Sequence, residues 1–324
     1  MYRVIILSKS EIEKSLKMNE ALKAVEKALN LQREGNVVMP PKIYLDLPKY
    51  EGNFRAMPAY IDGYVGIKWV SVYPNNHSHN LPSVLATIIL CDPNTGQPLA
   101  IMDGTCITAI RTGAIGGVAV KYLARQVSSV IGIIGAGMQA KTQLMAVSQV
   151  LPKIKEVKVF DQYREASLKY VMEMGAELNL NIRPVDTIEQ ASEADILVTT
   201  TPSRRPVIKK QYVKPGTHIN AIGADAAGKQ EFEGTLLKNA KIVVDDIEQA
   251  SHSGEINIPL SKGQIKIDDI YSTLGDIVAN IKKGRENETE ITIFDSTGLA
   301  IQDIACAKML YEKLKGAKLP AVDF

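Results

Sequence analysis

The second half of the chain alternates regularly between short apolar strands, tight turns and helices. The alternation begins at SSVIGIIGAG (128–137) and continues through EVKVFD, a helix expected near 164–175, DILVTTT, THINAIGAD, KIVVDD and ITIFDSTG. Apolar runs that alternate with helices are typical of a parallel sheet covered by helices. This pattern predicts an α/β domain over residues 122–298.

The first strand of this alternation enters a glycine-rich turn that opens a helix. Gly135, Gly137 and Ala140 form the pattern G-x-G-x-x-A. Gly135 permits the tight turn, Gly137 lets backbone N–H groups approach a pyrophosphate, and Ala140 keeps helix and strand close. The next strand, VKVF, ends in Asp161, where a carboxylate can bind ribose hydroxyls. Together these features predict a Rossmann domain that binds a nicotinamide dinucleotide.

Asp161 also bears on which dinucleotide binds. A 2′-phosphate beside this carboxylate would meet like-charge repulsion, which favours NAD. Arg164 is near enough in sequence to pair with such a phosphate, so NADP stays the alternative. Met138 and Gln139, at the start of the helix after the turn, are also assigned to the cofactor site.

The remaining residues predict a second, α+β domain formed by 1–121 and 299–324. A strand at 3–7 precedes Ser8, which is spaced from Glu11 as in a capping box. Helical periodicity follows over 21–31 and is stopped by Gly35, and residues 42–102 contain short β-like runs that indicate a largely antiparallel sheet. A helix is expected at 105–124, and the final helix, which ends in Gly316, is expected to return to this domain.

The helix at 105–124 contains Gly113, Gly116 and Gly117. Each glycine lowers helix stability by about 1 kcal/mol relative to alanine. Either close packing against another helix or the approach of a cofactor to the backbone would explain them, and the sequence leaves both explanations open.

Composition excludes several classes of protein. Lys+Arg of 38 against Asp+Glu of 36 leaves a net charge of +2, too small to predict a nucleic-acid partner. No apolar run is long enough for a signal peptide or a membrane span, so we expect a cytoplasmic protein with a small-molecule partner. Cys91, Cys106 and Cys306 are expected to be reduced packing residues, and His77 and His79 to be loop residues that bind no metal.

Lys68 is the first candidate for chemistry. It lies among apolar residues in GIKWVSVY, where strand alternation turns it to the same face as Gly66 and Val70. A partly buried amine can have its pKa lowered toward neutrality, which suits a general acid/base on an amino or imino group. The alternative is a solvated lysine on an edge strand.

Three further cations lie in apolar or small-residue surroundings: Lys42, Arg55 and Arg111. The guanidinium fork of arginine matches a carboxylate through two parallel hydrogen bonds, so a substrate acid is one possible partner. A structural ion pair is the other.

Two polar segments follow strands of the second domain. Asp225 lies in IGADAAGKQEF at the carboxyl end of a strand, where ligands bind in open α/β sheets, although its location alone slightly favours a turn-forming aspartate. Gly223 in the same segment is assigned to the cofactor site. His252 and Glu255, in SHSGEINIP, are interpreted as a solvated turn.

Four segments in this order resemble the ornithine cyclodeaminase/μ-crystallin family: GIKWVSVYPNN, IMDGTCITAIRTGA, GIIGAGMQA and IGADAAGKQEF. The resemblance covers nearly the whole chain. It implies a homodimer, with the domain made from both chain ends serving for substrate binding and dimerisation. It also implies that Lys68 acts as acid/base, that Arg111 holds the substrate carboxylate, and that Asp225 assists proton or water chemistry. Thr112, Lys229 and Ser296 are implied near the cofactor.

The family contains several activities, and FRAMPAY is similar to its archaeal alanine dehydrogenase branch. In cyclodeaminases the matching motif carries a glutamate near Arg55 for the distal amine of the substrate, and an arginine replaces Lys42. A cation at Arg55 would repel an ornithine ammonium group. The resemblance therefore implies NAD-dependent oxidation of a small amino acid, L-alanine, to a keto acid and ammonium. Ornithine cyclodeaminase, ketimine or cyclic-imine reductase, and a non-catalytic dinucleotide binder are the alternatives.

Overall fold

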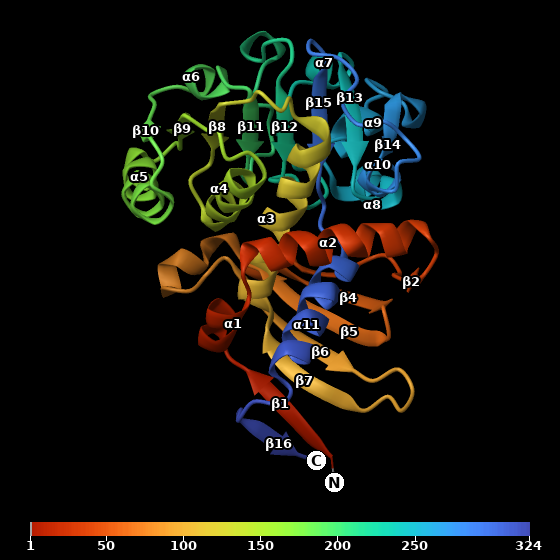
Figure 1. Cartoon of the computed structure of the whole chain (residues 1–324). Helices are drawn as coiled ribbons and strands as arrows, with labels where there is room; N and C mark the ends of the chain where they lie inside the picture. Colours follow the sequence, from red (N-terminus) through yellow and green to blue (C-terminus); the bar gives the residue numbers. More distant parts are fainter. Residues whose placement is uncertain (1) are drawn as a thin grey trace. The chain divides into compact units, whose positions relative to one another are not determined.

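The computed structural model describes residues 2–324 and divides into two compact units. Residues 1–111 and 299–324 form unit 1, and residues 112–298 form unit 2. The division falls inside helix α3 (Gly104–Leu123), which also contains the boundary predicted at residue 121. Figure 1 shows the helices and strands of both units.

Unit 2 is built on an eight-stranded, wholly parallel sheet in the order β10-β9-β8-β11-β12-β15-β13-β14. Its strands are β8 (Val130–Ile134), β9 (Glu156–Phe160), β10 (Ile182–Pro184), β11 (Ile196–Thr199), β12 (His218–Ala221), β13 (Ala240–Val244), β14 (Ile270–Thr273) and β15 (Ile291–Asp295). Its helices after α3 are α4 (Met138–Val150), α5 (Arg164–Leu178), α6 (Ile188–Ser192), α7 (Gly234–Leu237), α8 (Ile247–Ser253), α9 (Asn257–Ser261) and α10 (Leu274–Val278). The strands after the first are placed on either side of it, which is the doubly wound Rossmann arrangement. The predicted fold class is confirmed.

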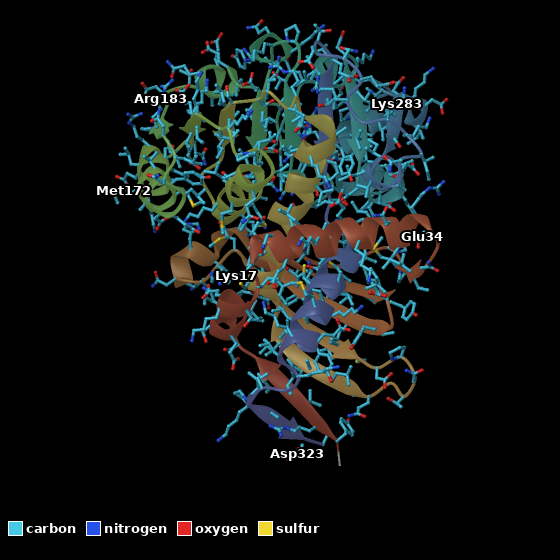
Figure 2. The ribbon with its side chains drawn as sticks, viewed as in Figure 1. Lys17, Glu34, Met172, Arg183, Lys283 and Asp323 are labelled. Atoms are coloured by element: carbon cyan, nitrogen blue, oxygen red, sulfur yellow. The ribbon has the colours of Figure 1, made fainter. Side chains whose placement is uncertain are left out.

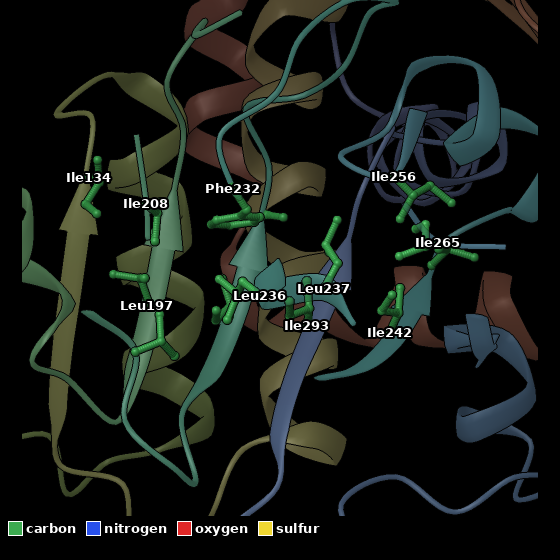
Figure 3. Close-up of a cluster of buried hydrophobic side chains, with 14 of the residues drawn as sticks. Ile134, Leu197, Ile208, Phe232, Leu236, Leu237, Ile242, Ile256, Ile265 and Ile293 are labelled. Atoms are coloured by element: carbon green, nitrogen blue, oxygen red, sulfur yellow. The ribbon is translucent and has the colours of Figure 1, made fainter. Parts of the chain in front are cut away.

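Most residues of the unit 2 strands are buried because helices and loops cover the sheet. Figure 3 shows one cluster of its buried side chains, including Leu197, Phe232 and Ile293. A second cluster is centred on Ile131, Leu144 and Val159. Burial of this apolar surface fixes the carboxyl ends of the strands, where the loops begin.

Unit 1 contains a mixed sheet in the order β16-β1-β7-β6-β5-β4-β2, with β3 also paired to β4. Its strands are β1 (Arg3–Leu7), β2 (Val37–Val38), β3 (Ile43–Leu47), β4 (Gly52–Ile61), β5 (Tyr64–Val72), β6 (Val84–Cys91), β7 (Pro98–Asp103) and β16 (Ala321–Asp323). Its helices are α1 (Lys9–Ser15), α2 (Met18–Arg33) and α11 (Ala300–Leu314). Strands β3 to β7 pair antiparallel, as predicted, whereas β1 pairs with β7 in parallel.

One face of the unit 1 sheet is covered by helices. Helix α11 packs against α2 and across β4, β5 and β6, so the final helix lies in the same unit as the N-terminal segment (Figure 1). Residues that alternate along β4, β5 and β6 toward these helices are buried, among them Met57, Val70 and Ile88. The opposite face carries partly exposed apolar side chains.

The glycines of α3 are explained by packing within unit 2. A Cβ added to Gly113 would lie 2.4 Å from the carbonyl oxygen of Thr142, and one added to Gly116 would lie 1.9 Å from Oε1 of Gln143. Both partners belong to α4, so α3 and α4 approach more closely than side chains at these positions would allow. Close helix packing is therefore the explanation at these two positions.

Charged side chains such as Arg183 and Lys283 project from the surface of unit 2 (Figure 2). Within residues 2–324, no helix combines the length and the apolar character that crossing a membrane requires.

Candidate active site

Lys68 is buried in unit 1. It is 1% exposed and lies on β5 between Met57 of β4 and Ile88 of β6. The pKa of its amine is lowered to about 7, mainly by burial and then by the positive charge of Arg111, while Asp303 opposes both. An amine with this pKa can accept or release a proton near neutral pH.

Asp303 is the buried partner of Lys68. One of its carboxylate oxygens lies 2.7 Å from Nζ of Lys68, and the other accepts a hydrogen bond from Nε of Arg111 at 2.8 Å. Gln302, the residue before it, accepts a hydrogen bond from Nη1 of Arg111 at 2.9 Å. Burial opposes ionisation of Asp303, but Arg111 and Lys68 outweigh it and hold the pKa of the carboxyl below its usual value. The three charged groups form one buried cluster, called here the Lys68–Asp303–Arg111 triad.

A glycine allows this arrangement. A Cβ added to Gly66 on β5 would lie 2.6 Å from Cδ1 of Ile304 on α11. Because Gly66 has no side chain, α11 lies close against β5, and the first turn of the helix brings Asp303 to Lys68. The predicted alternation of Gly66, Lys68 and Val70 on one face of the strand is confirmed.

The other two predicted cations belong to the same part of unit 1. Arg55 is buried on β4, where the register places it opposite Val70 and therefore on the face of the sheet that carries Lys68. Its Nε donates to Oδ1 of Asn53 at 3.0 Å, and its guanidinium lies 5.3 Å from the ring centre of Tyr44. Lys42, just before β3, is close enough for its charge to lower the pKa of Lys68. The structure thus brings Arg55 and Lys68 to one face of the unit 1 sheet, with Lys42 near enough to act on Lys68 electrostatically.

The glycine-rich turn of unit 2 has the geometry that a dinucleotide requires. Gly135 follows β8 with a φ of 93°, a conformation that favours glycine. Gly137 is the N-cap of α4, and a Cβ placed on it would meet nothing within 4 Å. Ala140 is fully buried against the core. An open helix N-terminus with no side chain in front of it leaves space for a pyrophosphate. Met138 is exposed at the first turn, and Gln139 is half-buried beside it.

Asp161 lies at the end of β9, the position predicted for ribose recognition. Its carboxylate accepts hydrogen bonds from the backbone N–H groups of Ala136, at 2.8 Å, and Tyr163, at 2.9 Å. These bonds tie it to the glycine-rich turn. Arg164 forms an ion pair with Asp186, which engages the cation that could have favoured a 2′-phosphate.

Asp225 lies in the loop that follows β12. Its carboxylate forms an ion pair with Lys229, four residues later. Gly223, two residues before it, donates its backbone N–H to Glu231 at 3.1 Å. The loop that carries Asp225 is thereby anchored to a buried carboxyl group of the same unit.

Glu231 belongs to a group of buried acids at the carboxyl ends of the parallel strands: Glu231, Asp245, Glu255 and Asp295. Burial raises the pKa of Glu231, and burial with the nearby charge of Glu231 raises the pKa of Glu255 well above its usual value. Burial raises the pKa of Asp295 to about 8. The interpretation of Glu255 as part of a solvated turn was wrong, because its carboxylate is fully buried and accepts the N–H groups of Glu231 and Phe232.

The other predicted residues lie at separate places. The carbonyl of Thr112 accepts a hydrogen bond from Nε2 of Gln143 at 2.6 Å, and Ser296 follows β15 with its hydroxyl 3.5 Å from Asp245. His77 and His79 lie on an exposed 3₁₀ turn (Pro74–His79). The cysteines are unbonded: Cys91 is half-buried, and Cys106 and Cys306 are buried.

Sequence reasoning missed Asp303, Gln302 and Glu231. Gln302 and Asp303 interrupt the apolar residues of GLAIQDIACA, and polar residues inside an apolar helix are usually buried with a partner. The sequence therefore indicated that Gln302 and Asp303 are buried with a partner. It could not identify that partner, because the partner depends on contacts between distant segments. Glu231 lies two residues after Lys229, in the segment IGADAAGKQEF that also contains Asp225.

The sheet order and the glycine-rich turn define the class of α/β proteins that bind dinucleotides. The chain belongs to the ornithine cyclodeaminase/mu-crystallin family, whose model matches residues 3–318.

Three relatives illustrate the range of similarity. The alanine dehydrogenase of Archaeoglobus fulgidus is 52% identical over 309 residues, which covers 95% of this chain and 94% of that protein. The solved structure of an archaeal alanine dehydrogenase dimer with bound NAD has a TM-score of 0.96 and 50% identity, and it covers 100% of both chains. The Δ¹-pyrroline-2-carboxylate reductase of Thermococcus litoralis, solved with NADH and L-proline, has a TM-score of 0.96 and 41% identity over 99% of this chain and 100% of that one.

Proposed function

We propose that this protein is an NAD-dependent dehydrogenase that oxidises a small L-amino acid, L-alanine, to pyruvate and ammonium. The observation that carries the proposal is the buried Lys68–Asp303–Arg111 triad, with a lysine pKa of about 7, in a chain 52% identical to an alanine dehydrogenase. The balanced reaction consumes L-alanine, NAD⁺ and water, and it yields pyruvate, ammonium, NADH and a proton.

NAD, when bound, accepts a hydride from the α-carbon of the substrate. The residues proposed to hold it are Arg111, Thr112, Gly135, Gly137, Met138, Gln139, Asp161, Gly223, Lys229 and Ser296. The fit is supported by the open N-terminus of α4, the left-handed conformation of Gly135 and the carboxylate of Asp161 tied to the turn. The engagement of Arg164 by Asp186 favours NAD over NADP.

The residues of this chain would divide the remaining work. Arg111 and Arg55 would hold the substrate carboxylate, and Lys42 would add positive charge beside them. Lys68 would exchange a proton with the substrate nitrogen, because its amine can change charge near neutral pH. Asp225, paired with Lys229, would assist proton transfer to or from water during imine hydrolysis.

The positive charge of this site supports a small substrate. Arg55 and Lys68 lie on one face of the unit 1 sheet, and Lys42 affects Lys68 electrostatically. Such a site attracts a carboxylate and repels a second ammonium group. A short, uncharged side chain such as that of alanine therefore fits better than the aminopropyl side chain of ornithine.

The test measures NADH formation by absorbance, with purified protein, NAD and one amino acid at a time: L-alanine, L-ornithine, L-proline or L-lysine. We expect reduction of NAD with L-alanine. Formation of proline from ornithine without net NADH would instead identify an ornithine cyclodeaminase and would overturn the substrate argument. Binding of NAD with no turnover of any amino acid or imine would identify a non-catalytic binder.

Cyclic-imine reduction is the second candidate. The Thermococcus litoralis reductase is 41% identical to this chain and was solved with NADH and L-proline. Reduction of an imine would use the same arginines to hold the carboxylate and the same proton donor, Lys68. The hydride would move in the opposite direction, and no hydrolysis would occur. Oxidation of NADH by Δ¹-pyrroline-2-carboxylate, without activity toward alanine, would favour this candidate.

A homodimer is also proposed. The face of the unit 1 sheet opposite α11 exposes large apolar side chains: Ile43, Leu45, Val65, Trp69, Leu85 and Ile89. A continuous apolar face of this kind marks an interface, and a two-fold dimer buries the same patch of both copies. The structural relative with bound NAD is described as a dimer. Light scattering on the Trp69→Asp variant should show a monomer where the wild type is dimeric.

The assignment of 1–121 and 299–324 to substrate binding and dimerisation, and of 122–298 to dinucleotide binding, is part of this proposal. The cytoplasmic location stays a prediction.

A further inference from the structure

The carboxylate of Asp303 contacts two groups with different proposed roles. It lies 2.7 Å from the amine of Lys68, which would move the proton, and 2.8 Å from Nε of Arg111, which would hold the substrate. All three side chains are at least nine-tenths buried, so solvent screens these interactions weakly. A single carboxylate thus links proton transfer to substrate binding.

We propose that Asp303 is a positioning residue of this active site, which fixes Lys68 and Arg111 relative to each other and supplies the negative charge that lets Lys68 carry a proton. This inference rests on the proposed function. In this proposal Asp303 does not itself contact the substrate. It sets the positions of Lys68 and Arg111, which do, and the protonation of Lys68.

The charges around Lys68 show why this partner matters. Arg111 on α3 and Lys42 before β3 both disfavour the protonated amine, as burial does. Asp303 on α11 opposes them. Cys306, one turn after Asp303 on α11, stays a neutral thiol because burial raises its pKa to about 12. Without the carboxylate, the remaining influences on Lys68 would all favour the neutral amine.

The backbone holds Asp303 in place. It lies in the first turn of α11, where a carboxylate is favoured by the helix dipole. The close approach of Ile304 to Gly66 sets the distance from α11 to β5. Gln302 binds Nη1 of Arg111 and therefore fixes the orientation of the guanidinium against Asp303. The position of the carboxylate is determined by packing, so a longer side chain would displace it.

Two substitutions separate charge from position. Asp303→Asn keeps the shape and removes the charge, whereas Asp303→Glu keeps the charge and moves it by one methylene. Asp62→Asn is the matched control, because Asp62 pairs with Lys308 of the same helix and lies outside the triad. If loss of α11 stability alone caused the effects, the control would reproduce them.

The first readout does not depend on turnover. Protein labelled with ¹³C-lysine reports the pKa of Lys68 by NMR, with the signal assigned through Lys68→Met. We expect Asp303→Asn to lower that pKa by about one to three pH units, since an opposite charge at this distance has an effect of that size. Asp303→Glu should restore most of the shift, and Asp62→Asn should leave the pKa unchanged.

The second readout is steady-state kinetics with L-alanine and NAD. For Asp303→Asn we expect kcat/KM for alanine to fall about 100-fold and the pH limb assigned to Lys68 to move to lower pH. Asp303→Glu should keep the pH limb near its wild-type position but raise KM for alanine, because Arg111 is displaced.

The outcomes are distinct. If the wild type does not oxidise alanine, the proposed function fails, while the NMR titration still tests the effect of Asp303 on Lys68. A wild-type pKa and pH profile in folded Asp303→Asn would overturn the inference. If Asp303→Asn does not fold, Asp303→Glu carries the test, and an unchanged KM for alanine in that variant would overturn the positioning role.

Discussion

The two units bury charge in opposite ways. In unit 1, Lys68, Arg111 and Asp303 are buried together, and each cation lies within 2.8 Å of the one carboxylate that they share. In unit 2, a group of buried acids lies at the carboxyl ends of the strands: Glu231, Asp245, Glu255 and Asp295. Their carboxyl oxygens accept hydrogen bonds from backbone N–H groups and hydroxyls, as when Glu231 accepts bonds from Thr199 and Thr201.

These two kinds of buried charge suit different roles. Opposite charges stabilise each other's ionised forms, so the carboxylate of the triad stays ionised, and Asp303 partly offsets the burial and the Arg111 charge that bring the pKa of Lys68 to about 7. Burial, reinforced by neighbouring carboxylates, raises the pKa values of Glu255 and Asp295, so these acids of unit 2 tend to hold protons. The first arrangement provides groups for chemistry, and the second shapes the strand ends where the proposed cofactor site begins.

Removing the amine should produce the largest effect. Lys68→Met keeps a long apolar side chain in a buried position and removes the proton carrier. We expect kcat/KM for L-alanine to fall by about 10²- to 10⁴-fold, the range typical of a lost general acid/base. The measurement is initial-rate NADH formation. Thermal stabilisation by NAD should persist, because binding of the cofactor does not need this amine.

The control is Lys27→Met, an exposed lysine of the same unit. It should keep wild-type kinetics. If Lys68→Met retained alanine turnover, the triad would be a structural ion cluster, and the buried opposite charges of unit 1 would have no catalytic role.

Removing one acid of unit 2 should change the dependence of stability on pH. Burial raises the pKa of Asp295 to about 8, so its proton is bound more tightly in the folded than in the unfolded state. The stability from this group is fully present below its unfolded pKa of about 3.9 and is lost as the pH rises through about 8. Asp295→Asn cannot ionise. Relative to wild type, the variant should gain about 2 to 5 kcal/mol between pH 4 and pH 8.

Urea denaturation at a series of pH values measures this change. Asp268→Asn, at an exposed position of unit 2, is the matched control and should follow the wild type. A difference between Asp295→Asn and wild type that stayed constant with pH would show that Asp295 is ionised in the folded protein.

Much of this fold could be predicted because its signals are local. The capping box of Ser8 and Glu11 is present, with the backbone N–H of Ser8 2.7 Å from the carboxylate, and helix α1 begins directly after it. The glycine-rich turn is equally local. Strands β10, β14 and β16 were missed because each is short and includes charged or polar residues, so no apolar run marks it.

The site could be predicted only in part. Lys68 and Arg111 stood out as cations among apolar or small residues, but their shared partner Asp303 lies 192 residues after Arg111. Glu255 was misassigned for the same reason, since its burial depends on segments that are distant in the chain. Local sequence reveals an unusual residue, whereas its partner is fixed by tertiary packing.

Substitution of Asp161, which belongs to neither buried group, should have the smallest effect on stability. It should instead change the preference between NAD and NADP. Asp161 is only half-buried and bonds the N–H groups of Ala136 and Tyr163. We expect Asp161→Asn to change the free energy of unfolding by less than about 1 kcal/mol. It should weaken NAD binding about tenfold and strengthen NADP binding, because the like-charge repulsion of a 2′-phosphate is removed. Calorimetric titration with each dinucleotide measures both effects, and parallel weakening of NAD and NADP would show that Asp161 only shapes the glycine-rich turn.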